Sequence, residues 1–207
     1  MFRSIENKLS TGLFTDYFDE KLIKYRLLED MNINNPNFFS FGRVRTIICE
    51  EGDYKDENID LGLGYLDKVH EGDFIIVKGS NRFAYFGELM STLSAKRKLS
   101  GTCILGKTRD SRFTQNIFPT WSKGFSPVDI KSRGRVSSVG SEFSYKDIVI
   151  NEKKYVVADK DGVVIFDVNP SLIKNDIETM VSHEGNIKEL IDEGSTVEDL
   201  LKNTSSF

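Results

Sequence analysis

The sequence predicts a mixed α/β fold in one domain, and three stretches of the chain support this class. Residues 73–106 read as strand, helix and strand, which is typical of a crossover between two parallel strands. Residues 128–167 hold short apolar runs between polar or glycine-containing turns, which favours several short strands. Domains commonly hold ~100–200 residues. We therefore expect one domain over residues 1–207, with a core at about 9–168 and a helical tail at about 170–203.

The first element that we expect is a helix from Thr11 to Glu20. It carries large apolar side chains at helical spacing, namely Leu13, Phe14, Tyr17 and Phe18. An asparagine-rich loop then leads to an apolar strand around residues 42–49. Both elements are expected to contribute packing rather than chemistry.

The crossover supplies the candidate site. We expect a strand at 73–78, a loop at 79–84, a helix at 86–99 and a strand at 101–106. Glu88 then begins a helix, and Arg109 and Asp110 follow a strand. Adjacent parallel strands end at the same edge of a sheet, so these side chains can converge. An arginine and two carboxylates together favour a site for a small anion and a divalent cation.

The remaining elements complete the mixed pattern. We expect strands at 135–139, 147–150, 155–158 and 163–167, with Asp161 and Gly162 in a hairpin turn. Pro170 and Ser171 mark the start of a helix, and Gly194 marks its end. Ser195 and Glu198 have the spacing of a capping box for a last helix.

Composition narrows the partners. The net charge of −4 argues against nucleic acid as the main ligand, and the basic run Lys96–Lys98 reads as a solvated face. No apolar run reaches the roughly 18 residues that cross a bilayer, so we expect no membrane insertion. Cys49 and Cys103 lie in apolar strands without a C-x-x-C pair. We expect buried free thiols in a reduced, cytoplasmic chain, and we expect His70 and His183 at the surface.

Six motifs resemble, in order, those of the RraA-like proteins, which include 4-hydroxy-4-methyl-2-oxoglutarate aldolases and a regulator of ribonuclease E activity. Gly87-Glu88, twenty residues and then Arg109-Asp110 is similar to the D/E-x20-R-D signature of that family. The other five motifs are Thr11–Asp16, Phe41–Thr46, Glu71–Val77, Trp121–Asp129 and Ala158–Val164. The resemblance spans roughly residues 9–201. It implies a swivelling β/β/α fold and a homotrimer, or a multiple of one, with sites between subunits.

The resemblance also implies a chemistry. The carboxylate of pyruvate would bind at the start of the helix, which is formed by Gly87, Glu88, Leu89 and Met90. Arg109 would add its planar, permanently charged guanidinium to the same site. Asp110 would hold Mg²⁺ or Mn²⁺. Glu88 would order water or transfer a proton, although an acidic residue there also simply complements the helix dipole. An Arg-Asp pair after a strand is, by itself, also often a loop salt bridge.

The function expected from the resemblance is a metal-dependent lyase that cleaves a 4-hydroxy-2-oxo acid to pyruvate. The same electron sink would permit decarboxylation of oxaloacetate. The alternative is a non-catalytic regulator that binds a ribonuclease, although that branch tends to lose the Arg-Asp pair. Some relatives are labelled methyltransferases, but this sequence has no glycine-rich loop after a strand to bind a nucleoside cofactor.

The chain departs from the family pattern around the site. Leu105 replaces an acidic residue, and Lys107, Arg112 and Phe113 are expected to make the mouth more basic and more apolar. A larger or more acidic 2-oxo acid would fit such a mouth. Glu198 lies where some family members send a carboxylate into a neighbouring site, but its capping-box spacing explains it without function.

Overall fold

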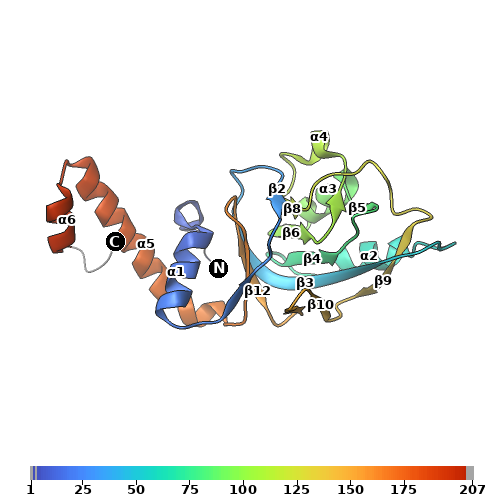
Figure 1. Cartoon of the computed structure of the whole chain (residues 1–207), viewed down its shortest axis with the longest axis horizontal. Coiled ribbons are helices and arrows are strands. Elements are labelled where there is room, and N and C mark those ends of the chain that lie inside the picture. Colours follow the sequence, from blue (N-terminus) through green and yellow to red (C-terminus); the bar gives the residue numbers. More distant parts are fainter. Residues whose placement is uncertain (1, 3, 204–207) are drawn as a thin grey trace.

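The computed structural model describes residues 2 and 4–203, and it confirms the mixed α/β class (Figure 1). The large sheet contains β1 (Tyr25–Leu27), β2 (Asn32–Ile33), β3 (Ser40–Glu51), β4 (Phe74–Lys78), β6 (Gly101–Ile104), β8 (Thr120–Ser122), β9 (Gly134–Val139), β12 (Tyr155–Ala158) and β13 (Val163–Phe166). Two further pairs are β5 (Ala84–Phe86) with β7 (Lys107–Thr108), and β10 (Phe143–Tyr145) with β11 (Ile148–Ile150). The helices are η1 (Glu6–Lys8), α1 (Thr11–Glu20), α2 (Ile59–Leu66), α3 (Glu88–Lys96), α4 (Ser111–Thr114), α5 (Pro170–Asp192) and α6 (Val197–Asn203).

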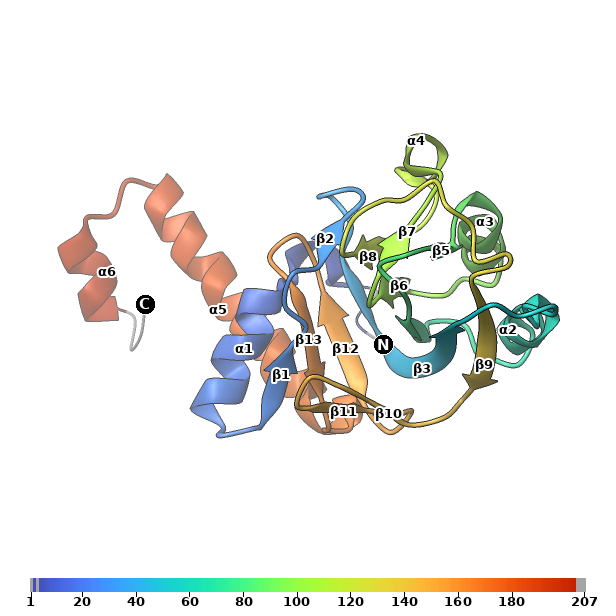
Figure 2. The ribbon, with the colours of Figure 1, turned by 45° about the vertical axis from the view of Figure 1, so that its right-hand side comes forward.

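The long strand β3 organises the sheet. Its first residues pair antiparallel with β12, and its later residues pair with β4 in parallel and with β9 antiparallel. The order across the sheet is β1-β13-β12-β3-β4-β6-β8-β2, and β3, β4, β6 and β8 run parallel. Figure 2 shows β3 curving between the two halves of the sheet. The carboxyl ends of the four parallel strands therefore share one edge.

The helix α1 has the predicted bounds because both its cap and its apolar face agree with them. The Ser10 hydroxyl accepts a hydrogen bond from the Leu13 amide at 3.1 Å, which satisfies one free N–H of the first turn. Its four large apolar side chains are buried against β12 and β13 and against α5. Thr11 also donates from its amide and its hydroxyl to Asp159 at 2.7 and 2.8 Å. These bonds fix α1 to the turn between β12 and β13.

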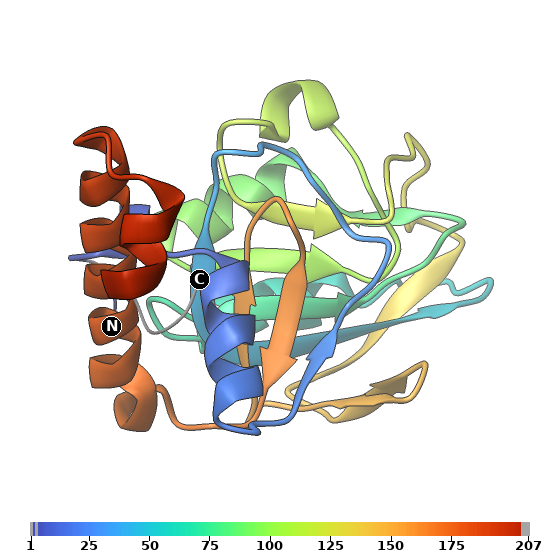
Figure 3. The same ribbon diagram turned by 60° about the vertical axis from the view of Figure 1, so that its left-hand side comes forward.

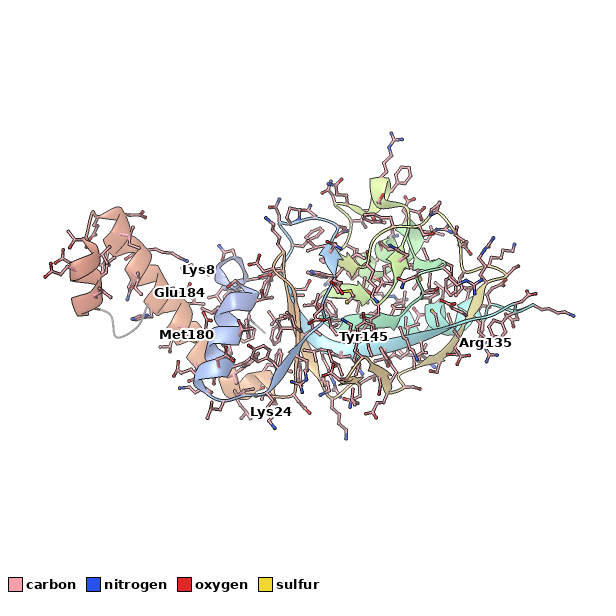
Figure 4. All side chains as sticks on the ribbon, in the orientation of Figure 1. Lys8, Lys24, Arg135, Tyr145, Met180 and Glu184 are labelled. Atoms are coloured by element: carbon pink, nitrogen blue, oxygen red, sulfur yellow. The ribbon has the colours of Figure 1, made fainter. Side chains whose placement is uncertain are left out.

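The helix α5 lies beside α1 (Figure 3) and continues away from the sheet (Figures 1 and 2). Asn169 caps its start by accepting from the Ser171 amide at 3.0 Å, and Pro170 fits the first helical position. Ile173, Ile177 and Val181 are buried in the core that α1 lines. Met180 also packs against that core, and Figure 4 shows it with Glu184 on the part of α5 near α1.

Several predicted bounds were wrong by a few residues, and one motif was wrong in register. The crossover helix begins at Glu88 and not at Phe86, because Phe86 ends a short strand. The capping box is formed by Thr196 and Asp199 and not by Ser195 and Glu198. Thr196 Oγ1 accepts from the Asp199 amide at 3.2 Å, and Asp199 Oδ2 accepts from the Thr196 amide at 3.2 Å.

The expected turn between Asp161 and Gly162 is confirmed, since the Asp159 amide donates to the Gly162 carbonyl at 3.1 Å. His70, His183 and the run Lys96–Lys98 are exposed, as predicted. Both cysteines are buried free thiols, and burial raises the pKa of Cys49 to about 12. Among the helices of the described residues, none has the length and apolar character that crossing a membrane requires.

Candidate functional site

The two junctions that carry the predicted site lie side by side. β5 and β7 pair in parallel, so the chain enters α3 and α4 from adjacent strands. The Arg109 amide donates to the Phe86 carbonyl at 3.0 Å, and the Thr108 hydroxyl donates to the same oxygen at 2.6 Å. The structure therefore brings Glu88 and the pair Arg109-Asp110 together at the carboxyl edge of the parallel strands.

Close backbone contact between the parallel strands makes this convergence possible. The Lys107 amide donates to the Ser80 carbonyl at 2.7 Å, directly after Gly106. A Cβ on Gly106 would meet the Ser80 carbonyl oxygen at 2.4 Å and its nitrogen at 2.5 Å. Glycine is required there because the two backbones touch. A side chain at position 106 would force apart the two segments that lead to α3 and α4.

Arg109 is held between two carboxylates. Its Nε donates to Asp110 Oδ2 at 3.1 Å, and its Nη1 contacts Asp129 Oδ2. The Glu88 amide donates to Asp110 Oδ2 at 3.2 Å, so the first turn of α3 joins the same cluster. Charge-assisted bonds of this kind fix the guanidinium plane. Its Nη2 bonds none of the residues that the structure describes, so that edge of the fork is open to an anion.

Gly87 permits the approach of the two junctions. A Cβ on Gly87 would lie 2.4 Å from Asp110 Oδ2 and 2.7 Å from Arg109 Cγ. Gly87 is also the N-cap residue of α3 and supplies no side-chain cap. The amides of Leu89 and Met90 therefore lack a capping side chain, and they are available to an anion. The expected anion site at Gly87–Met90 therefore has one donor fewer than predicted, because the Glu88 amide already donates to Asp110.

Asp110 adopts a left-handed backbone conformation, with φ +58° and ψ 34°. Aspartate tolerates this conformation better than most residues other than glycine. The Asp110 carbonyl accepts from the amides of Phe113 and Thr114 at 2.9 and 3.0 Å, which begins α4. Its side chain is about one third exposed, at 34%. Hydrogen bonds from the described residues reach only Oδ2, which leaves Oδ1 free of such bonds.

A pocket of about 210 Å³ lies at this cluster. It is lined by Ile59, Leu63, Tyr85, Gly87, Glu88, Leu89, Met90, Arg109, Asp110, Asp129 and Ile130. The four charged side chains form its polar part, and side chains from α2 and the 130 turn form its apolar part. Every predicted site residue lines this pocket. The volume of the pocket is smaller than the roughly 300–1,000 Å³ of pockets that bind drug-sized ligands. A small substrate fits such a volume.

Asp129 is the site residue that sequence reasoning missed as a functional group. It closes the motif Trp121–Asp129, whose match to the family pattern was the available signal. Its backbone forms a parallel bridge with Ala84, and its Oδ1 accepts from the Lys131 amide at 2.8 Å. A residue in a turn between strands carries no periodicity that would reveal its partner. Only the fold brings it to Arg109.

The prediction of a more basic and more apolar mouth to the site is wrong. Lys107, Arg112 and Phe113 do not line the pocket. The Lys107 ammonium donates to the Lys123 carbonyl at 3.1 Å, and the Arg112 guanidinium stacks over the Phe113 ring in solvent. Leu105, which replaces an acidic residue of the family pattern, is buried in the core beneath the sheet. These departures therefore leave the pocket itself without an added cation.

The carboxylates of the site fit a hydrated cation such as Mg²⁺ better than a metal ion that is held by protein ligands alone. Within residues 2 and 4–203, no group of three His, Cys, Asp or Glu side chains is arranged to hold an ion. Structural zinc needs about four such ligands. Mg²⁺ instead keeps several waters and takes one or two carboxylates with the substrate completing its shell. The open oxygen of Asp110 meets that requirement, and Glu88 stands next to it in the pocket lining.

A larger groove, of about 940 Å³, lies at the other end of the parallel strands. It is lined by the start of β3, by residues 71–73 just before β4, and by Ser100, which precedes β6. Ligands of open α/β sheets bind outside the carboxyl ends of the strands, where Arg109 lies. We therefore identify the smaller pocket as the candidate site, in spite of its volume.

Comparisons with known proteins agree with this fold. The family model RraA-like, described as Aldolase/RraA, matches residues 14–165. A protein of Bacillus anthracis with the provisional name 4-hydroxy-4-methyl-2-oxoglutarate aldolase is 28% identical over 116 residues, which cover 55% of this chain and 72% of that protein.

Two solved structures are similar in fold. An uncharacterized protein from Pseudomonas syringae pv. tomato superposes with a TM-score of 0.73 at 22% identity, and 96% of each chain is covered. Streptomyces coelicolor RraAS2, titled an unusual member of the RNase ES inhibitor RraA protein family, has a TM-score of 0.68 at 18% identity and covers 90% of this chain and 91% of its own. Because the family model matches most of the sequence, the chain belongs to the RraA-like family.

Proposed function

We propose that this protein is a divalent-metal-dependent carbon–carbon lyase that cleaves a 4-hydroxy-2-oxo acid to pyruvate. One observation carries the proposal. The open edge of the Arg109 guanidinium, the open oxygen of Asp110 and the uncapped start of α3 meet in one small pocket. A salt bridge that only held a loop in place would not need a pocket beside it. If Glu88 or Gly87 only had to begin a helix, we would expect a side chain that caps α3, and none does so.

The substrate is bound through its charged end. The C1 carboxylate of a 2-oxo acid accepts hydrogen bonds from Arg109 Nη2 and from the amides of Leu89 and Met90. Asp129 keeps the guanidinium in place and thereby acts as a positioning residue. Because the arginine stays charged at ordinary pH, it also stabilises the negative charge that grows on the enolate.

Bond cleavage requires a proton acceptor and a proton donor. When the C4 hydroxyl loses its proton, the C3–C4 bond breaks, a carbonyl forms at C4, and the electron pair moves into the enolate of pyruvate. Protonation at C3 then gives pyruvate. Glu88 lines the pocket and pairs with none of the described residues, so its carboxylate can move these protons directly or through one water.

Asp110 would hold Mg²⁺ or Mn²⁺ through its open oxygen, with water and substrate as the other ligands. When bound, such an ion supplies positive charge that polarises the 2-oxo group. Loss of carbon dioxide from oxaloacetate passes through the same enolate, so decarboxylase activity is an expected side reaction.

The test is release of pyruvate from 4-hydroxy-4-methyl-2-oxoglutarate and from oxaloacetate with Mg²⁺ or Mn²⁺. We expect turnover that a chelator abolishes and that added metal restores. Asp110→Ala should lose metal binding in calorimetry, whereas Arg109→Ala should keep the metal and bind pyruvate more weakly. Activity in the presence of chelator, or full activity in both variants, would refute the assigned site.

A non-catalytic role as a ribonuclease regulator is the competing proposal, since RraAS2 shares the fold. Failure to cleave any 2-oxo acid with either metal would favour that role. The family resemblance further implies a homotrimer, which light scattering would report as about three times the 23.5 kDa chain mass. A monomer at micromolar concentration would contradict it.

A further inference from the structure

We infer that Tyr85 is a positioning residue, which fixes the distance between α2 and the charged side of the pocket through one contact with Gly62; its effect on catalysis rests on the proposed lyase function. Tyr85 lies on β5, two residues before Gly87, the N-cap residue of α3. Its side chain lines the pocket. The strand that leads to the charged residues therefore also carries the side chain that meets α2.

β5 belongs to the charged side of the pocket. It leads into Glu88, and it pairs in parallel with β7, which leads to Arg109 and Asp110. Its first residue, Ala84, forms a backbone bridge with Asp129. Each charged residue of the lining is thus placed by this strand or by a segment paired with it. A side chain of β5 that supports another element holds that element at a fixed distance from the charged cluster.

α2 is the element that Tyr85 supports. Ile59, Gly62 and Leu63 have the spacing i, i+3 and i+4, so they share one face of this helix. Ile59 and Leu63 line the pocket. A Cβ on Gly62 would lie 1.9 Å from the Tyr85 hydroxyl oxygen and 3.0 Å from the ring carbon that bears it. The tyrosine therefore reaches the helix backbone, and its hydroxyl occupies the space of the missing side chain.

Both residues of this contact are locally unfavourable choices. Gly62 stands inside a helix, where glycine is destabilising relative to alanine. The Tyr85 hydroxyl is buried and bonds none of the described residues, so phenylalanine would avoid an unpaired polar group. Burial raises the pKa of this phenol, so it stays neutral at ordinary pH and acts as a spacer. Departures from local rules of this kind are expected at functional sites.

The contact stands between two anchors of α2. Before the helix, Asn58 Nδ2 donates to the Val136 carbonyl at 3.2 Å, and near its end the Tyr65 hydroxyl donates to Glu152. With both ends held, a change at the middle contact shifts the helix face that lines the pocket. All of these contacts lie within one chain, so they persist when a neighbouring subunit adds residues to the site.

The experiment is a double-mutant cycle on the KM for oxaloacetate and for 4-hydroxy-4-methyl-2-oxoglutarate. Gly62→Ala pushes α2 away from β5, so KM should rise at least about tenfold, because displacements near 1 Å have large effects. Tyr85→Phe empties the space of the hydroxyl, and KM should rise about threefold as α2 loses this support. In Gly62→Ala/Tyr85→Phe the methyl group fills that space, so KM should return to within about threefold of the parent.

KM separates this role from a loss of folded protein, since unfolded molecules lower the apparent kcat and leave KM unchanged. Gly64→Ala is the matched control on α2, because a Cβ there meets no atom within 4 Å. Tyr145→Phe is the control for the hydroxyl, because that hydroxyl is also buried and unpaired among the described residues but does not line the pocket. Both controls should keep the KM of the parent.

Three results would decide against the contact. A Gly62→Ala variant with the KM of the parent, or a double variant as impaired as Gly62→Ala, overturns the inference and leaves the lyase function intact. If Gly62→Ala does not fold, equal KM values for Tyr85→Phe and Tyr145→Phe overturn it. A parent that releases pyruvate from neither substrate removes the proposed function and this inference together.

Discussion

At the scale of single residues, Gly87 fixes the distance between the two halves of the site. Replacing it with alanine puts a methyl group 2.4 Å from Asp110 Oδ2 and 2.7 Å from Arg109 Cγ. Both atoms belong to side chains, so they can move without unfolding the protein. We expect Gly87→Ala to lower kcat/KM by about 10²-fold, because displacements near 1 Å can have effects of that size. Thermal unfolding should change little.

Gly64 provides the control for this variant. It lies on α2, next to Leu63 of the pocket, and a Cβ there meets no atom within 4 Å. Alanine in a helix interior is favoured over glycine by roughly 0.5–1 kcal/mol, so Gly64→Ala should keep its activity and melt slightly higher. Equal loss of activity in both variants would mean that Gly87 has no special role in the site.

The residues of the site were predictable to different degrees. Glu88, Arg109 and Asp110 follow from local spacing, because each flanks a strand or helix whose pattern is visible in the sequence. Asp129 meets Arg109 across twenty residues from a segment without regular structure. The apolar wall from Ile59 and Leu63 depends on how α2 packs, which no local pattern encodes. Three of the four charged lining residues were therefore predicted, whereas Asp129 and the apolar wall were not.

At the scale of elements, the short strands β5 and β7 escaped prediction. Ala84, Tyr85 and Phe86 are apolar and directly precede a helix, so they fit a helical pattern as well as a strand. Lys107 and Thr108 form a strand of two residues, which is shorter than any usable alternation. Their pairing is a product of the tertiary fold. It is nevertheless what brings the starts of α3 and α4 together.

The last helix shows how a motif can be right in kind and wrong in register. Two overlapping candidates, Ser195 with Glu198 and Thr196 with Asp199, both have capping-box spacing. The structure uses the second, and hydrogen bonds from Thr196 lower the pKa of the Asp199 carboxyl. We expect Thr196→Ala to weaken α6 by ~1 kcal/mol and Ser195→Ala to have little effect. Hydrogen exchange of the α6 amides measures both, and the reverse order would restore the first assignment.

At the scale of the whole molecule, few contacts attach the C-terminal helices to the sheet. α5 packs on α1, and α1 is in turn fixed to the turn between β12 and β13 through Thr11 and Asp159. The buried part of α5 ends near Val181, and the helix continues to Asp192 away from the sheet (Figures 1 and 2). Stability of this arrangement therefore depends on a small number of groups in the contact between α1 and α5.

Tyr17 is one such group, and its titration provides a test of the contact. Its hydroxyl donates to Asp176 of α5 at 2.8 Å, and burial together with this bond raises its pKa from 10.0 to about 12. Because the folded state holds the proton more tightly, this stabilisation is complete below pH 10.0 and is lost as the pH rises toward 12. Tyr17→Phe has no proton to lose. Its unfolding free energy should be lower by roughly 0.5–1.5 kcal/mol at neutral pH.

The same variant should also lose stability less steeply than the parent above pH 10.0. Urea unfolding across that range measures both effects. Asp176→Asn removes the negative partner but keeps the phenol, so its slope should lie between those of the parent and Tyr17→Phe, because burial of the ring persists. Parallel pH profiles for all three proteins would show that this contact does not hold the C-terminal helices to the body. Attachment would then depend on the apolar face of α5 that carries Ile173, Ile177 and Val181.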